Sequence, residues 1–152
     1  MTDTNRLTAQ DIYDRVPLGA RLAYSDGEPE PPKRFTRKHA DWRRNNGTGM
    51  LISKAPPQTM PSYHLPGRFT LHEGNFGGTS GPLIVLHRTY LFTTSLHFHI
   101  ISNPPAGSVQ ILQPLGDTPE LLHLATNENE ARAWLAANRY SDAYTVQVPE
   151  AA

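Results

Sequence analysis

Apolar and polar residues alternate along much of this chain, which is the pattern of strands with one buried face. The alternation is clearest at Leu96, Phe98 and Ile100, which we expect to face the core. An uninterrupted apolar run at residues 83–86 predicts a central strand that is buried on both faces. Further strand-like segments lie at residues 20–24, 50–53, 68–72, 109–112, 121–124 and 144–148.

Capping patterns predict a helix near each end of the chain. Near the N-terminus, Thr8 and Asp11 have the spacing of a capping box, and the helix they begin must end before Pro17. Near the C-terminus, Asn127 followed by Glu130 marks a second helix start. The apolar face of this second helix consists of Ala131, Trp134 and Leu135.

Composition adds a fold class to these elements. A chain of 152 residues has the usual size of one domain, so we expect a single domain over residues 1–152. The 14 prolines and 11 glycines fall mostly between apolar runs, which predicts turns within a folded domain. We therefore predict an α+β fold: a twisted, mainly antiparallel sheet of six or seven strands, with the C-terminal helix packed on one face.

The longest connection is a Pro-rich excursion over residues 28–47, between the first two predicted strands. Connections of this length usually have a function. Within it, Thr36 is expected to cap a helix that ends at a left-handed Gly47. Arg37 and Asp41 lie four positions apart on that helix and are expected to pair.

The basic charge of the protein is concentrated in this excursion. The whole chain is neutral, with 14 basic and 14 acidic residues, yet the segment from Lys33 to Arg44 holds six basic residues and one acidic residue. Cations interleaved with aromatic rings can neutralise phosphates and stack on bases. The candidate binding residues are Lys33, Arg34, Phe35, Arg37, Lys38, Trp42, Arg43 and Arg44.

These features predict a small non-enzymatic binding module that contacts a polyanion. Nucleic acid is the first candidate and an acidic protein surface is the second, while a merely solvated cationic protrusion is the functionless alternative. A protein-partner adaptor or inhibitor would use the same segment or an exposed sheet edge. The sequence contains no recognisable zinc-finger, RNP or helix-turn-helix pattern.

Histidines provide a second candidate chemistry. His97 and His99 lie on one face of a predicted strand, where an H-x-H pair can bind one metal through two imidazoles. The pair resembles the first element of a cupin metal site, which implies a third ligand, and His87 on a neighbouring strand is a candidate. The cupin pattern also expects a Glu a few residues later, and residues 100–103 contain none. A His-ligated metal is the second alternative, and no other cofactor is expected.

The Gly-rich residues 78–83 resemble the nucleophile loop of chymotrypsin-like serine proteases, with Ser80 in the nucleophile position. Only 79 residues precede Ser80, which is too few for the first barrel of such an enzyme. The segment also lacks the Gly-Lys-Ser/Thr ending of a phosphate-binding loop. We therefore interpret it as a flexible turn.

The chain has no cysteine, which excludes disulfides, thiolate metal ligands and cysteine nucleophiles. Its first ten residues lack the basic and then apolar pattern of a signal peptide. No apolar run approaches the length of about 18 residues that a membrane-spanning helix requires. We therefore expect a cytoplasmic protein without membrane contact.

Overall fold

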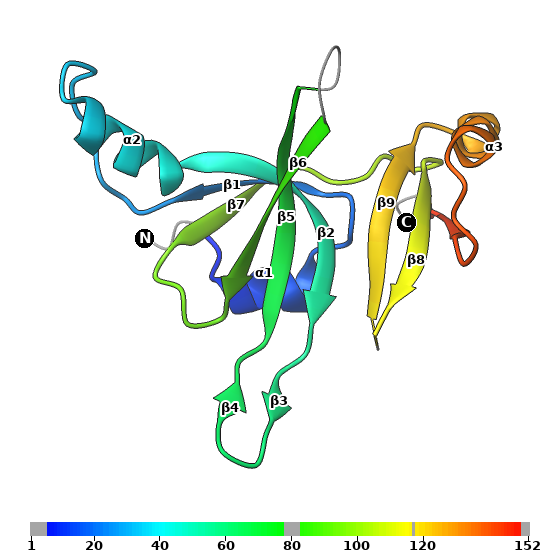
Figure 1. The fold of residues 1–152 in the computed structure, drawn as a ribbon, viewed down its shortest axis with the longest axis horizontal. Helices are drawn as coiled ribbons and strands as arrows, with labels where there is room; N and C mark the ends of the chain where they lie inside the picture. The colour runs from blue at the N-terminus through cyan, green and yellow to red at the C-terminus, as the bar shows by residue number, and fades with distance from the viewer. Residues whose placement is uncertain (1–5, 78–82, 117, 150–152) are drawn as a thin grey trace.

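The expected α+β class is confirmed by the computed structural model, which describes residues 6–77, 83–116 and 118–149 (Figure 1). Its strands form one eight-stranded antiparallel sheet and a separate two-stranded sheet, which is more than the six or seven strands expected. The elements are α1 (Ala9–Arg15), β1 (Arg21–Ser25), α2 (Thr36–Arg44), β2 (Gly47–Ala55), β3 (Gln58–Thr59), β4 (His64–Leu65), β5 (Arg68–Gly77), β6 (Leu83–Leu91), β7 (His97–Ser102), β8 (Val109–Leu115), β9 (Thr118–Ala125), α3 (Glu128–Ala137) and β10 (Tyr144–Gln147).

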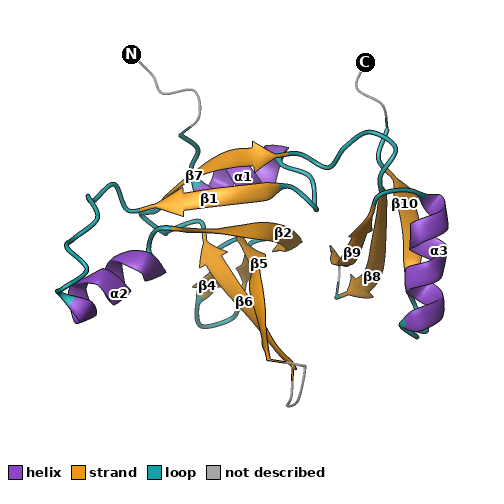
Figure 2. Cartoon of the chain, turned by 90° about the horizontal axis from the view of Figure 1, so that it is seen from above, coloured by secondary structure: helices purple, strands orange, loops and turns teal. Residues whose placement is uncertain are grey.

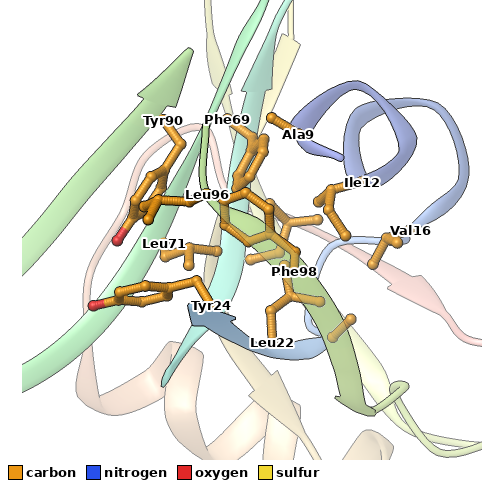
Figure 3. Packing of buried hydrophobic residues seen from close by; sticks show 12 residues of the cluster. Ala9, Ile12, Val16, Leu22, Tyr24, Phe69, Leu71, Tyr90, Leu96 and Phe98 are labelled. Atoms are coloured by element: carbon orange, nitrogen blue, oxygen red, sulfur yellow. The ribbon is translucent and has the colours of Figure 1, made fainter. Parts of the chain in front are cut away.

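Five strands form the body of the protein around the largest core cluster. They lie in the order β7-β1-β2-β5-β6. The strands β1, β2, β5 and β6 are neighbours in chain order, and β7 then returns to pair with β1. The capping box of α1 forms as expected from Thr8 and Asp11. The helix packs against this body and buries Ala9 and Ile12 there. Figure 3 shows these side chains packed with aromatic residues of the strands, including Phe69 and Phe98.

The strand β2 contains a β-bulge and contributes side chains both to this body and to the core of the C-terminal part of the chain. The pairing of β2 with β5 shifts register between Leu51 and Ser53, and all three residues from 51 to 53 are buried. Because successive side chains of a strand point to opposite faces, Leu51 lies in the main core cluster and Ile52 in a second cluster with Leu112 and Leu121. One strand therefore contributes consecutive apolar side chains to two cores.

The C-terminal part consists of the β8–β9 hairpin, α3 and β10 (Figure 2). The predicted helix start is confirmed, since the Asn127 side chain accepts a hydrogen bond from the backbone N–H of Glu130. The predicted apolar face is also confirmed. Ala131 is fully buried, and Trp134 and Leu135 pack around it. Beyond the helix, β10 pairs with β8 alone among the described strands and keeps its side chains exposed.

Two strand predictions are wrong. The apolar run at residues 83–86 opens β6, which pairs only with β5 in the described part of the sheet, because β7 returns to β1 instead of adding beside β6. It is thus an edge strand, and Leu86 is 43% exposed. On β7, Leu96 and Phe98 face the core as expected, but Ile100 is 38% exposed.

The connections also differ from expectation. The Pro-rich link after β2 contains the short pair β3 and β4, which was not predicted. The strand β5 continues to Gly77, beyond the predicted strand-like segment at residues 68–72. Ser80 and the protease-like segment around it lie outside the described residues. In the described ranges, no helix has the length and apolar character needed to cross a membrane.

Candidate polyanion interface

The basic excursion lies between β1 and β2, and α2 projects from the body on the side opposite α3 (Figure 1). The helix α2 starts at Thr36, which was expected to be its N-cap, so it starts one residue earlier than predicted. Phe35 occupies the N-cap position and makes no side-chain hydrogen bond there. The helix buries none of its residues and has no acidic residue in its first turn. Two arginines, Arg43 and Arg44, stand in its last turn, where the helix dipole favours positive charge.

Contacts with the preceding loop fix α2 in place. The indole N–H of Trp42 donates to the Glu28 carbonyl oxygen at 2.8 Å. His39 Nε2 lies 2.9 Å from a carboxylate oxygen of Glu30. Trp42 is half-buried in this position, so the structure assigns it to anchoring the helix and leaves Phe35, which is 44% exposed, as the ring that faces solvent.

Asn46 is the centre of the anchoring network. Its side-chain amide donates to Asp26 at 3.0 Å and to the Trp42 carbonyl oxygen at 2.8 Å, and it accepts from the Ser25 hydroxyl at 2.6 Å. The backbone N–H of Glu28, followed by the Asn46 amide, lowers the pKa of Asp26 below its usual value. The Asn46 side chain therefore connects both ends of the excursion. The sequence placed Asn46 in a turn but did not indicate this role.

Gly47 does not end α2 in the left-handed conformation that was predicted. Asn45 is the C-cap, and Gly47 is the first residue of β2. A Cβ atom at Gly47 would lie 2.7 Å from the Tyr24 hydroxyl oxygen. A glycine is needed there because the tyrosine approaches closely.

The cations of residues 33–44 are largely free of acidic partners. Arg44 lies 3.7 Å from Asp41, whereas Arg37 was the partner expected for that carboxylate. Two cations, Arg34 and Lys38, lie over the Phe35 ring, at 4.9 Å and 5.6 Å from its centroid. No ion pair within the described residues involves Lys33, Arg34, Arg37, Lys38 or Arg43.

A groove of about 510 Å³ separates the C-terminal half of α2 from β6. Three arginines line it, Arg43, Arg44 and Arg88, together with His87. The Arg88 guanidinium donates to the Arg44 carbonyl oxygen, which connects the strand to the end of the helix. Sequence reasoning missed Arg88, since 44 positions separate it from Arg44 and no local pattern signals their proximity.

The groove is also lined by Tyr24 and Glu73, and Tyr90 lies next to both of them outside the lining. The Tyr90 hydroxyl donates to the Glu73 carboxylate at 2.7 Å, and Arg88 lies over the rings of Tyr24 and Tyr90. Burial raises the pKa of both tyrosine hydroxyls, so they stay protonated near neutral pH. Glu73 is the one carboxylate among the described lining residues, against three arginines, so the groove has an excess of positive charge.

The candidate metal ligands do not meet in the described structure. His97 and His99 share a face of β7 opposite Ser25 and Ala23, while His87 lies on β6 opposite His72. No group of three or more His, Asp or Glu side chains within the described residues is arranged to hold a metal ion. His97 Nδ1 is buried and has no hydrogen-bond partner in the structure.

Comparison with known proteins adds a family but no activity. The family model described as "Uncharacterised conserved protein UCP036055" matches residues 7–152. No curated protein and no solved structure matches the chain. Any statement about function therefore depends on the geometry of the molecule.

Proposed function

The chain belongs to this uncharacterised family, and we propose that the protein is a small non-enzymatic binding module that contacts nucleic acid through α2 and the adjoining groove. The observation that carries the proposal is a helix that buries none of its residues and presents Arg37, Lys38 and Arg43, which form no ion pair within the described residues. Surface helices usually have an apolar stripe packed on a core. The composition of α2 instead suits a ligand with repeated negative charge.

Two further observations favour nucleic acid over a single small anion. The exposed Phe35 ring lies beside Arg34 and Lys38, so a base that stacks on it would bring its phosphates near two cations. At the other end of α2, Arg43 and Arg44 meet Arg88 across the groove. The cations thus extend along the helix and into the groove, as a backbone with successive phosphates requires.

The test is fluorescence-anisotropy binding of single- and double-stranded DNA and RNA over a salt series. The wild type is compared with a variant in which Arg37, Lys38, Arg43 and Arg44 are all changed to Ala. We expect the logarithm of the wild-type affinity to fall with log salt by about 0.7 per contacted phosphate for a single strand and about 0.9 for a duplex. The variant should bind at least tenfold more weakly and with a shallower slope.

The matched control removes the same charge from exposed sites away from α2. It changes four arginines to Ala: Arg15, Arg21, Arg132 and Arg139. The control should keep the wild-type slope. If both variants weaken binding equally, net charge alone explains it and the α2 interface is wrong. If wild type does not bind at low salt, the nucleic-acid proposal fails.

The second candidate is an adaptor for a protein partner, which the free edge of β10 favours. β10 has no second neighbour among the described strands, and its Tyr144 and Val146 side chains are each 42% exposed. An unpaired edge of this kind can add a strand from another chain. This candidate predicts that nucleic acid is ignored and that a β10 substitution on the unpaired edge, Thr145→Pro, abolishes capture of one specific partner.

A further inference from the structure

The groove between α2 and β6 contains a carboxylate that contact with phosphates alone does not explain. Glu73 on β5 is half-buried and lines the groove together with three arginines. No ion pair within the described residues involves Glu73. A phosphate backbone needs only cations, and a carboxylate beside it weakens binding through repulsion. The position of Glu73 therefore indicates a ligand group that donates hydrogen bonds.

Glu73 is held in position and still has acceptor capacity. The Tyr90 hydroxyl donates to its Oε1 atom at 2.7 Å. Tyr90 is itself buried and packs against Phe69 and Phe98. An ionised carboxylate offers about four acceptor positions, so one hydroxyl donor leaves most of them for a ligand. A carboxylate fixed in this way can accept two parallel N–H donors at once.

The rest of the groove suits a flat ring. Its volume of about 510 Å³ lies within the range of about 300–1,000 Å³ that is typical of small-molecule pockets. Leu86 on β6 and Ala40 on α2 give it apolar surface. Ala40 precedes Arg43 by three positions and Arg44 by four, so one face of α2 presents both apolar surface and cations to the groove.

Arg88 adds a fixed planar group on the strand side of the groove. Its guanidinium donates to the Arg44 carbonyl oxygen and lies 5.0 Å from the centroid of the Tyr90 ring. Guanidinium planes can stack on unpaired bases. A base in the groove would thus have a plane to stack on, apolar side chains beside it and one carboxylate at its edge.

We propose that this groove binds one unpaired guanine of a single-stranded nucleic acid, with Glu73 accepting hydrogen bonds from the guanine N1–H and its exocyclic amine. Among the common bases, guanine alone has two adjacent N–H donors on its Watson–Crick edge. That edge is occupied in a duplex, so the site requires an unpaired base. Arg43, Arg44 and Arg88 would neutralise the flanking phosphates. This specificity rests on the nucleic-acid contact proposed above.

The experiment measures fluorescence anisotropy with oligothymidine strands that differ in one central base: guanine, hypoxanthine, adenine, cytosine or thymine. Hypoxanthine keeps the N1–H of guanine and lacks the exocyclic amine. A bidentate contact between a side chain and a base discriminates about fivefold to a hundredfold. We therefore expect the guanine strand to bind about tenfold more tightly than the thymine strand, with hypoxanthine between them. Equal affinity for guanine and hypoxanthine would overturn the two-donor contact.

Glu73→Gln should remove the preference for guanine, because an amide has one acceptor oxygen and its nitrogen opposes the N1–H. The affinity for the thymine strand should not fall, because a negative charge beside the phosphates is removed. Glu120→Gln is the matched control, since Glu120 on β9 is half-buried, accepts from the Gln113 side chain at 2.9 Å and lies outside the groove. A preference that survives Glu73→Gln, or that disappears with Glu120→Gln, would contradict the site.

The comparison of bases on the wild type separates this specificity from binding itself. If the wild type binds all five strands with one affinity and a clear salt slope, the guanine site is wrong and the contact through α2 stands. If it binds none of them at low salt, the proposed function fails as well. This comparison needs no variant, so it decides the specificity even if Glu73→Gln does not fold.

Discussion

The helices α2 and α3 have nearly the same length, nine and ten residues, but opposite relations to the rest of the protein. In α3, the N-cap side chain of Asn127 satisfies a backbone donor, and two acidic residues in the first turn suit the helix dipole. The helix also buries Ala131 against the β8–β9 hairpin. By contrast, α2 has no side-chain cap, no acidic first turn and no buried residue.

This difference indicates that the residues of α3 stabilise the fold and that those of α2 do not. Every favourable feature of α3 is explained by folding, whereas the cations of α2 repel one another and stabilise no core. The protein nevertheless holds α2 in a defined position through Trp42 and Asn46. A helix that contributes no burial and is still anchored at its C-terminal end fits a binding role better than a loop without function. The predictions below test this contrast, from the largest expected effect to the smallest.

The largest effect should come from the two tryptophans. Trp134 stacks between His123 and Tyr140 and packs beside Ala131, so Trp134→Ala should lower the free energy of unfolding by about 3 kcal/mol. Trp42→Ala in α2 removes one hydrogen bond and partial packing and should lower it by about 1 kcal/mol. Urea denaturation of both variants measures the two values. An equal loss in both would mean that α2 is as structural as α3.

The N-cap of α3 should have the next largest effect. Asn127→Ala removes the acceptor for the Glu130 backbone N–H and should lower the free energy of unfolding by about 1 kcal/mol. Asn129→Ala, in the same turn and also exposed, is the control and should cause no loss. Urea denaturation can check both. If the two variants lose the same amount, the hydrogen bond seen at Asn127 does not stabilise the helix start.

A further effect on α3 is present near neutral pH and disappears at acid pH. Hydrogen bonds from the Thr126 hydroxyl and from His123 lower the pKa of Glu130 to about 2. A lowered folded pKa contributes stability above the unfolded value of about 4.3, and this stability disappears as pH falls toward 2. Glu130→Gln should therefore be less stable than wild type at pH 6 and approach it by pH 2. Thermal unfolding over that range measures the difference, and Glu128→Gln should run parallel to wild type.

Local signals in the sequence predicted α1, α3 and the strands β8 and β9, because helix caps and strand alternation depend on residues a few positions apart. The edge position of β6 was not predictable in this way, since it depends on β7 returning to β1. The register shift of β2 between Leu51 and Ser53 likewise has no local sequence signal. At the candidate interface, the composition of residues 33–44 indicated the charge. The contribution of Arg88 and the anchoring by Asn46 required the tertiary structure.

The smallest effect on stability should come from the α2 cations themselves. Changing Arg37, Lys38, Arg43 and Arg44 to Ala should alter the free energy of unfolding by no more than about 0.5 kcal/mol, because none of them is buried. The sign should be favourable, since Ala is the best helix former and repulsion between the cations is relieved. Added salt screens that repulsion and should stabilise wild type more than the variant. A loss above about 1 kcal/mol would mean that the cations support the fold, and the contrast between the two helices would then give no reason to assign α2 to binding.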